Sequence, residues 1–435
     1  MSEVVTGITA LFVLILVFLT GIELAFAMAV IGFVGFAYIV GFAPACNLLV
    51  KDFFDTFTSY GFTVIPLFVL MGQIASNADI AKRLYHSAHK WVGHIPGGLA
   101  MTTVVGATLF KAMCGSTLAT AATFAGIAIP EMDRYGYDKK LSTGIVASVG
   151  TLGMLIPPSI VLIIYGIVVE QSIGRLFLAG IVPGLLISLF FIFVIYGWVK
   201  IDPAAAPATK KASLQERMHV LPEFIWVAVI FVAVIGGLMS GVFSPTEAGT
   251  IGTIAVMVLA VARKELGWKR LIKSIDESLR TACMVLFLIW GSVVLGHFLA
   301  VTQIPFIAAD WVVGLPLARW LVMILIILIY LLGGSFIDDL AFMILATPIF
   351  YPAVIKLGYD PVWFGIQIGI TIMIGVIIPP VAICVFVVKN ITGVPFGIIY
   401  RGVLPFLLSL IGCAMLLFLF PDIATFLPNL LMGKP

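Results

Sequence analysis

Long apolar segments recur along almost the whole chain and are separated by short stretches that contain most of the charged residues. A helix needs about 20 apolar residues to cross the hydrocarbon core of a bilayer. Ten segments meet this requirement and are predicted to span the membrane: 4–20, 22–42, 61–78, 141–168, 174–198, 222–240, 244–262, 278–300, 362–388 and 397–420. The first lacks a basic residue before it and a cleavage site after it, so it is interpreted as a retained span.

Two further apolar segments, 96–130 and 316–352, have a different pattern. Each is interrupted near its middle by a Gly-Ser pair, Gly115-Ser116 in the first and Gly334-Ser335 in the second. Each half is then about 15 residues long, which is too short to cross the membrane alone. Both segments are therefore predicted to be re-entrant helical hairpins with their tips inside the membrane, where irregular backbone is tolerated only if protein surrounds it.

The composition agrees with this architecture. Of the 435 residues, 62% are hydrophobic and 10% are charged, against about 45–50% and 25% in soluble chains. These values exclude a soluble enzyme, a nucleic-acid-binding protein and a secreted disulfide scaffold. The five cysteines are scattered without metal-ligand spacing and are interpreted as buried thiols that form no disulfides. The expected class is an all-α integral membrane protein with the lipid bilayer as its main solvent.

The basic residues indicate the orientation of the chain. The loops 79–95, 131–140, 199–221, 263–277 and 389–401 should share one face, and they contain 17 of the 24 Lys and Arg: Lys82, Arg83, Lys90, Arg134, Lys139, Lys140, Lys200, Lys210, Lys211, Arg217, Arg263, Lys264, Lys269, Arg270, Lys273, Lys389 and Arg401. The opposite face receives Lys51, Arg175, Arg319, Lys356 and Lys434. The positive-inside rule then makes the first face cytoplasmic and places both termini on the periplasmic side.

The chain also repeats itself. The interval from Pro157 to Pro183 equals that from Pro379 to Pro405, and the strings GYD and G-x-x-I-P-P occur at matching places in both halves. The first half has an odd number of crossings, so the second half should be inverted. Residues 1–200 are predicted to form the first repeat, 201–221 a cytoplasmic linker, and 222–435 the inverted second repeat. An inverted repeat with broken helices at its centre is typical of secondary transporters.

Two proline pairs, Pro157-Pro158 and Pro379-Pro380, fall inside the spans 141–168 and 362–388. Proline lacks the helical N–H and clashes with the preceding turn, so each span should break there and release backbone carbonyls. A simple packing kink would explain one such pair. Two pairs at equivalent places in a repeat favour a functional role, because the released carbonyls must face protein or a bound cation.

The hairpin tips provide the complementary groups. Ser116 and Ser335 are expected to cap the returning half-helices, whose exposed N–H groups favour an anion, while hydroxyls and carbonyls can also bind sodium. Close helix packing through small residues is the alternative explanation. Asp338 and Asp339 are costly at membrane depth, so a cation partner is expected for at least one, although Asp338 could also be an ordinary helix-end acid.

Lys111, four residues before Gly115, has three interpretations: it meets a substrate carboxylate, snorkels to the membrane surface, or pairs with an acid. Glu247 is expected to have a structural role, because Ser244-Pro245-Thr246-Glu247 matches a helix capping box, and Thr20 to Glu23 opens the equivalent span of the first half. His86, His89 and His94 lie among basic residues, which favours an interfacial surface helix over a metal site. The chain has no phosphate-binding G-x-x-x-x-G-K motif and no catalytic triad pattern, so no enzyme activity is expected.

Several of these strings resemble a known family. IPLFVLMG at 65–72, GSTLATAA at 115–122, IPEMDRYGYD at 129–138, GTLGMLIPPS at 150–159 and FSPTEAG at 243–249 are similar to signatures of the large membrane subunit of tripartite ATP-independent periplasmic (TRAP) transporters. The resemblance extends from about residue 4 to 420. It implies an elevator-type importer in the bacterial inner membrane that is coupled to Na⁺ and takes up an organic acid such as a dicarboxylate. It also implies two partners, a periplasmic substrate-binding protein and a small four-helix membrane subunit.

The resemblance further implies which residues form the sites. The coupling ions would bind where the tips meet the broken helices, at Ser116 with Gly150, Thr151 and Gly153, and at Ser335 and Asp338 with Ile372 and Gly375. The substrate would bind between the tips, at Lys111, Ser116, Thr117, Pro157, Pro158, Ser335, Pro379 and Pro380. Three residues depart from the family pattern: Lys111, Cys114 and Asp339. An ion channel and a membrane-embedded enzyme remain as alternatives.

Overall fold

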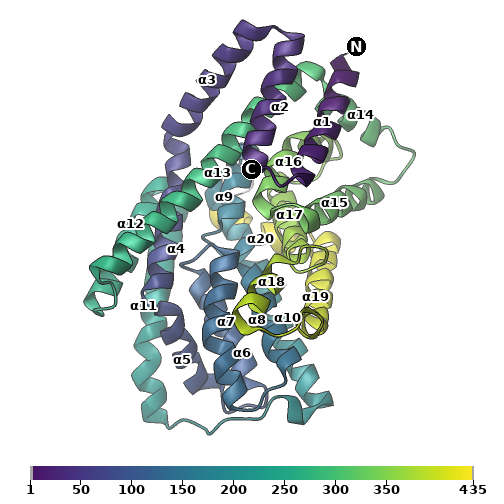
Figure 1. Cartoon of the computed structure of the whole chain (residues 1–435). Coiled ribbons are helices and arrows are strands. Elements are labelled where there is room, and N and C mark those ends of the chain that lie inside the picture. Colours follow the sequence, from purple (N-terminus) through teal and green to yellow (C-terminus); the bar gives the residue numbers. More distant parts are fainter. Residues whose placement is uncertain (1–2, 434–435) are drawn as a thin grey trace.

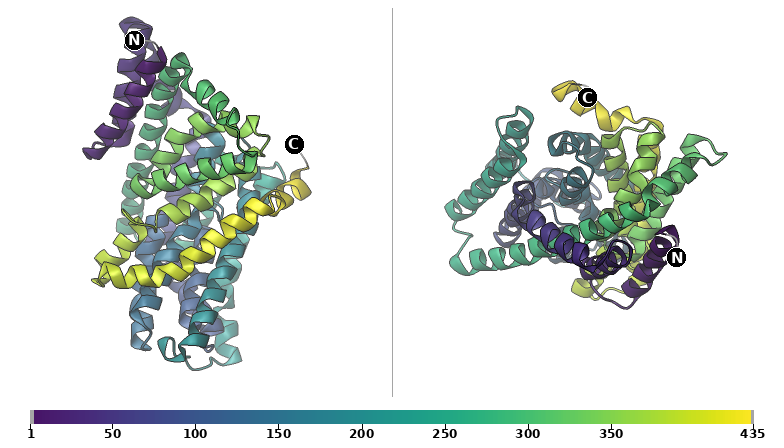
Figure 2. Two further views of the ribbon diagram at one scale, coloured as in Figure 1. Left: turned by 90° about the vertical axis from the view of Figure 1, so that its right-hand side faces the viewer. Right: turned by 90° about the horizontal axis from the view of Figure 1, so that it is seen from above.

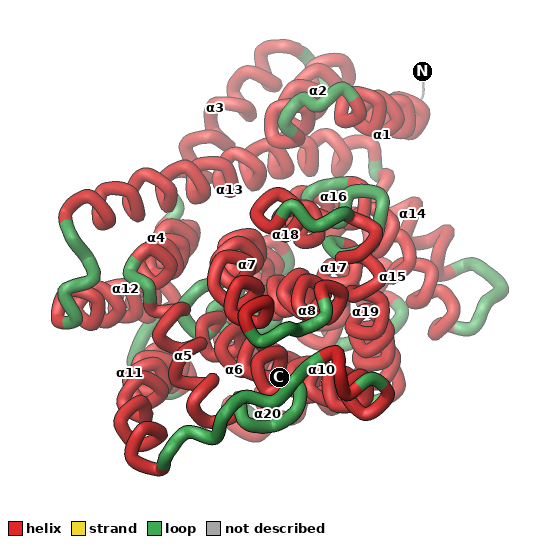
Figure 3. The backbone as a smooth tube through the Cα atoms, turned by 60° about the horizontal axis from the view of Figure 1, so that its bottom comes forward, coloured by secondary structure: helices red, strands yellow, loops and turns green. Residues whose placement is uncertain are grey.

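The computed structural model describes residues 3–433, except for the side chains of Phe18, Leu19, Val313 and Asp339. Lys434, which the sequence assigns to the periplasmic face, lies outside this range. All regular elements of the described residues are helices, as Figure 3 shows, so the predicted all-α class is confirmed. The first half contains α1 (Glu3–Leu19), α2 (Leu24–Ile39), α3 (Phe42–Thr58), α4 (Val64–Asn77), α5 (Ile80–Val92), α6 (Gly98–Lys111), α7 (Thr117–Arg134), α8 (Lys139–Gly150), α9 (Ile160–Val168) and α10 (Ile173–Ile201).

The second half begins after a short connection. Its helices are α11 (Leu214–Met239), α12 (Pro245–Ala262), α13 (Trp268–Thr302), α14 (Ile304–Val313), α15 (Arg319–Phe336), α16 (Asp339–Lys356), α17 (Pro361–Gly375), α18 (Ile383–Thr392), α19 (Phe396–Leu419) and α20 (Asp422–Met432). Three short 3₁₀ turns, η1 (Tyr60–Thr63), η2 (Thr151–Met154) and η3 (Pro203–Ala205), join some of them.

Seven of the described helices are long and apolar enough to cross a membrane. Five of them, α10, α11, α12, α13 and α19, coincide with predicted spans, and a sixth joins η1 to α4. The seventh is α15, whose 18 residues make the first arm of the second hairpin longer than predicted. The predicted spans 4–20 and 22–42 are the shorter apolar helices α1 and α2.

Both hairpins and both helix breaks are present. The arms α6 and α7 pack against each other around a tip at residues 112–116, and α15 and α16 form the second pair of arms. The predicted span 141–168 is divided into α8 and α9, and the predicted span 362–388 is divided into α17 and α18. The proline pairs therefore interrupt both helices, as the sequence predicts.

Four helical segments are missing from the sequence-based prediction. Helix α3 contains the charged residues Lys51, Asp52 and Asp55, so it lacks the uninterrupted apolar length from which membrane spans are predicted. Helix α13 begins at Trp268, which makes much of the predicted loop 263–277 helical. Helices α14 and α20 are only 10 and 11 residues long and are too short to be recognised as spans.

The predicted linker, residues 201–221, is shorter than expected and is hydrogen-bonded to the first half. Helix α11 begins at Leu214, after a capping box formed by Ser213 and Glu216. The N–H groups of Gly97 and Asp138 donate to the carbonyls of Ala206 and Ala205, at 3.1 and 2.8 Å. The connection is thus attached to the two loops that flank the first hairpin.

The region around α5 agrees with the helix predicted for the histidine-rich loop. His89 Nε2 lies 3.3 Å from Thr209 Oγ1 in the connection before α11, and His94 Nδ1 lies 3.3 Å from a guanidinium nitrogen of Arg217 in α11 itself. Within residues 3–433, no group of three or more His, Cys, Asp or Glu is arranged to hold a metal ion.

The helices of the two halves are interleaved. Helix α2 packs on α13, α4 packs on α12 and α13, and α8 packs on α19. In Figure 1, α4, α11 and α12 lie on one side of the molecule and α15 and α19 on the other, with α7, α8 and α9 between them. The right-hand view of Figure 2, from above, shows the same separation. Arm α7 of the first hairpin and the two parts of the first broken helix, α8 and α9, therefore lie in the middle of the bundle, whereas α15 of the second hairpin lies on one side of it.

Candidate functional site at the hairpin tips

Ser116 is the last residue of the first hairpin tip and lies directly before α7. Its Oγ accepts a hydrogen bond from the N–H of Ala119 at 3.3 Å and thereby caps α7, as predicted. The Ser116 carbonyl accepts a second bond, from the Thr120 hydroxyl at 3.0 Å. Thr117 is the first residue of α7 and is partly exposed. A capped helix N-terminus is a suitable place for an anionic group.

Gly115 is required at this tip because the backbone of the broken helix approaches it closely. A Cβ atom at this position would lie 2.7 Å from the carbonyl oxygen of Pro158 and 3.5 Å from the backbone nitrogen of Ile160. Gly115 does not have positive φ, so the turn itself does not require glycine here. Its absent side chain instead allows the tip to touch the start of α9, so the N-termini of α7 and α9 meet.

The first break is completely buried. Helix α8 ends at Gly150, residues Thr151–Met154 form η2, and Pro157 and Pro158 are joined by a cis peptide bond. Every residue from Thr151 to Ile160 is shielded from solvent. The Thr151 hydroxyl donates to the Ser148 carbonyl at 2.8 Å, which satisfies one of the carbonyls at the end of α8.

Ser159 is a functional candidate that the sequence analysis did not assign. Its Oγ donates to the Met154 carbonyl at 2.7 Å and accepts from the Leu162 N–H at 3.3 Å. It therefore bridges the break and caps α9 at once. A serine directly after a proline pair and before an apolar run is a recognisable cap pattern.

Ser159→Ala is expected to lower the free energy of unfolding by about 1–2 kcal/mol, because it removes a buried cap and leaves the Met154 carbonyl without this donor. Thermal unfolding of the purified protein measures the effect. Ser172→Ala is the matched control, since Ser172 caps α10 in the same way but is exposed. Equal shifts for the two variants would contradict the bridging role of Ser159.

Lys111 is buried at the first tip. Its side chain is 0% exposed, and Nζ donates to the Ser116 carbonyl at 2.8 Å. A Cβ atom on Gly153 would lie 2.2 Å from this Nζ, so the ammonium group also abuts the η2 turn. The snorkelling interpretation is therefore wrong, because the side chain turns inward to the tip.

The second tip is capped by Asp338. Its Oδ1 accepts from the Ala341 N–H at 3.2 Å. The prediction that Ser335 would cap the returning arm is wrong, because α15 continues to Phe336 and the turn follows it at Ile337 and Asp338. The Ser335 hydroxyl instead donates to the Leu332 carbonyl at 2.8 Å.

The second tip also touches its broken helix. A Cβ atom on Gly375 would lie 3.0 Å from the carbonyl carbon of Gly334 and 3.3 Å from the backbone nitrogen of Ser335. The carbonyl of Ile372 accepts the N–H of Val376 at 3.0 Å, so it remains within the helical pattern. Ser335 and Gly375, two of the predicted cation ligands in this half, are thus in contact with each other.

The second break differs from the first in its exposure. Pro379 and Pro380 are also joined by a cis bond, but both are exposed, whereas Pro157 and Pro158 are buried. Helix α18 begins after Ala382, which has a φ of 45° and provides no side-chain cap. The proline pair of the first break is therefore enclosed by protein, whereas the proline pair of the second break lies at the surface of the structure.

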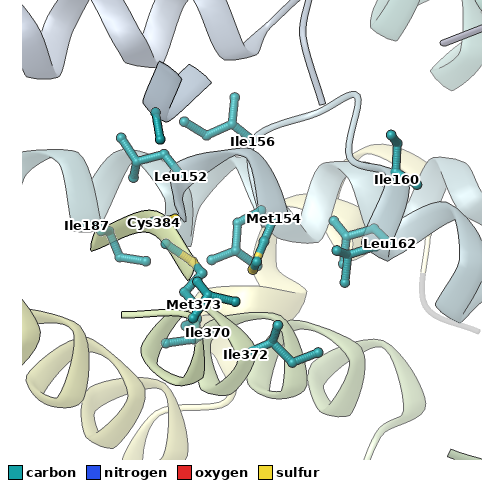
Figure 4. Packing of buried hydrophobic residues seen from close by; sticks show 14 of the residues in the cluster. Leu152, Met154, Ile156, Ile160, Leu162, Ile187, Ile370, Ile372, Met373 and Cys384 are labelled. Carbon is teal, nitrogen blue, oxygen red and sulfur yellow. The ribbon is translucent and has the colours of Figure 1, made fainter. Parts of the chain in front are cut away.

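Each broken helix packs against helices from the other half of the chain. Helix α18 packs on α7 and α8, while α9 packs on α16 and α17. A Cβ atom on Gly369 would lie 2.9 Å from Leu155 Cδ2, which places α17 directly against the first break. Figure 4 shows Met154 of η2 and Met373 of α17 in the apolar packing between the two broken helices.

A cavity of about 530 Å³ lies beside the second tip. Asp338 and Glu23 both line it, together with apolar residues of α2 and α13. Glu23 is the residue before α2, but its side chain makes no cap hydrogen bond, so the expectation that this acid caps the helix as Glu247 does is wrong. Glu247 behaves as predicted, since it forms a complete capping box with Ser244.

Multiple apolar spans, two hairpins and two broken helices whose ends meet at the hairpin tips are typical of secondary membrane transporters. The chain belongs to the family described as tripartite ATP-independent periplasmic transporter, DctM component, which matches residues 11–423. It is thus a TRAP transporter large permease and a multi-pass inner-membrane protein.

Characterised relatives are named as permeases and not as enzymes. The chain is 35% identical to the C4-dicarboxylate TRAP transporter large permease protein DctM of Pseudomonas aeruginosa, over 92% of this chain and 93% of the relative. It is 32% identical to the sialic acid TRAP transporter large permease protein SiaM of Vibrio cholerae, over 89% and 90%. The structure of the YdaH transporter of Alcanivorax borkumensis has the same fold, with a TM-score of 0.64, 13% identity, and coverage of 88% and 89%.

Proposed function

We propose that this chain is the translocating subunit of a sodium-gradient-driven importer of an organic acid. The main supporting observation is that each hairpin tip lies directly against a broken helix, through Gly115 and Pro158 in one half and Gly334 and Gly375 in the other. Carbonyl groups and helix C-termini at such breaks favour cations, and capped helix N-termini favour the substrate carboxylate. Cation and anion can then bind side by side away from lipid.

The proposed architecture follows the repeat in the sequence. Residues 1–200 and 222–435 act as two inverted units, and the hairpins with the broken helices move as one body against the remaining helices. The cytoplasmic face carries most Lys and Arg, and both termini are periplasmic. One elementary charge that moves through 100 mV provides about 2.3 kcal/mol, so sodium entry can drive accumulation of an acid.

The substrate class is proposed from the relatives. A small dicarboxylate is the first candidate, because the DctM permease is 35% identical to this chain, and a sialic acid is the second. We also propose that a periplasmic binding protein delivers the acid and that a small four-helix membrane subunit completes the transporter. Two longer relatives, the SiaT and DctMQ permease proteins, support the additional membrane subunit, since the chain matches only 61% and 59% of their lengths.

Uptake by the reconstituted transporter tests this function. The chain is placed in proteoliposomes with its small subunit, its binding protein is added outside, and entry of radiolabelled succinate or N-acetylneuraminate is measured. Uptake is expected only with an inward sodium gradient and should stop when choline replaces sodium. Uptake that persists in choline, or flux that rises linearly with concentration as in a channel, would contradict the proposal.

A further inference from the structure

Lys111 places a positive charge where the sequence predicts a sodium site. It is the last residue of α6, its side chain is fully buried, and Nζ donates to the Ser116 carbonyl of the tip at 2.8 Å. A charged side chain at membrane depth is costly unless polar groups surround it. A buried lysine is therefore expected only where its charge has a function or where surrounding polar groups stabilise it.

The surroundings of this ammonium group are those of a cation site. The C-terminal ends of α6 and of α8 both lie here, and each contributes partial negative charge from its last carbonyls. Gly153 in η2 leaves the space that the ammonium group uses, because a Cβ atom there would lie 2.2 Å from Nζ and 2.8 Å from Cε. Ser116 and Gly153, two of the predicted sodium ligands, are therefore both in contact with Lys111.

The second half has no such cation at the matching place. Four residues before Gly334 the chain has Tyr330, whose hydroxyl donates to Thr347 Oγ1 at 3.1 Å and so points to the other arm of its own hairpin. The space at Gly375 is filled by the backbone of Gly334 and Ser335. This tip carries the exposed carboxylate of Asp338, and its proline pair is exposed.

We infer that the Lys111 ammonium group is a built-in cation that occupies the first tip in place of a coupling sodium ion. Sodium then binds only at the second tip, near Asp338 and Gly375. This inference rests on the proposed sodium-driven function and refines it. The permanent cation holds the first tip against η2 in every transport cycle, and the ion gradient acts through the second tip alone.

Removing the ammonium group should restore a sodium site at the first tip. The number of ²²Na⁺ ions bound per chain is measured by equilibrium dialysis on the purified permease in nanodiscs. Lys111→Ala is expected to bind one more sodium ion than the wild type. Tyr330→Phe, which removes a buried polar group at the matching place, should bind the same number as the wild type. An unchanged count in the Lys111→Ala protein would overturn the inference.

A second measurement does not depend on the folding of the Lys111 variant. If sodium binds only at the second tip, Asp338→Asn in the wild-type background should leave no ²²Na⁺ ion bound with wild-type affinity. One ion that still binds with wild-type affinity in that variant would show a working first site and would also overturn the inference. Wild-type uptake that is independent of sodium would contradict the proposed function instead, so the two failures are distinguishable.

Discussion

Asp338→Asn is expected to weaken sodium activation of uptake by about 10- to 100-fold, because it removes the carboxylate charge from the second tip. Charge-assisted contacts contribute about 1.5–3 kcal/mol, and every 1.4 kcal/mol is a factor of ten in affinity. Asparagine caps a helix about as well as aspartate, so the cap to Ala341 should persist. The measurement is the sodium concentration that gives half-maximal uptake in proteoliposomes.

The control for this variant separates charge from capping. Ser244→Ala removes the cap of α12, which is far from both tips in the sequence and forms an ordinary capping box. It should cost about 1 kcal/mol of stability and leave the sodium dependence unchanged. If Asp338→Asn had the wild-type sodium dependence, or if Ser244→Ala shifted it equally, Asp338 would have only a structural role.

Gly402→Leu is expected to prevent correct packing of α19 against α8. Helices α8 and α19 touch through their backbones here, since a Cβ atom on Gly402 would lie 1.9 Å from the Lys140 carbonyl oxygen. On the facing helix, a Cβ atom on Gly144 would lie 2.3 Å from the carbonyl carbon of Gly402. Overpacking a tight contact by even a few methyl groups costs about 1–3 kcal/mol, and backbone atoms cannot move aside as side chains do.

The effect of this substitution is measured by the melting temperature and by the fraction of monodisperse protein after purification. Gly412→Leu on the same helix is the control, because a Cβ atom at Gly412 meets nothing within 4 Å. The Gly402 variant should have a clearly lower melting temperature or yield no folded protein, while the Gly412 variant should resemble the wild type. Similar behaviour of the two variants would contradict the close contact of α8 with α19.

Much of the fold was predictable because it depends on local patterns. The apolar length of a segment determines whether it can span a bilayer, and a proline pair breaks a helix wherever it stands. Hence α10, α12 and α19, both hairpins and both breaks follow from the sequence. Ser116 and Glu247 were also predictable as caps, because a cap acts on a backbone group only three residues away.

The residues that the sequence misassigned depend on where a helix ends or on distant partners. Ser335 and Asp338 are both suitable residues for a helix cap. Asp338 has this role because α15 continues through Ser335 to Phe336, so the turn begins two residues later than the Gly334-Ser335 pair suggests. Helix α3 was missed because its charged residues interrupt the apolar length that a predicted span requires. Ser159 was overlooked because its role includes a bond across the break to Met154.

The sequence by itself determined the class of this protein: an all-helical membrane chain with two hairpins, two broken helices and the signatures of a TRAP transporter large permease. The tertiary structure decided which groups meet, namely Lys111 with Ser116 and Gly153, and Gly115 with Pro158. The physical reason is that hydropathy, proline chemistry and capping act over a few neighbouring residues. Contacts between a tip and a broken helix, such as Lys111 with Gly153 and Gly115 with Pro158, depend on how segments far apart in the sequence pack together, and no local pattern encodes that packing.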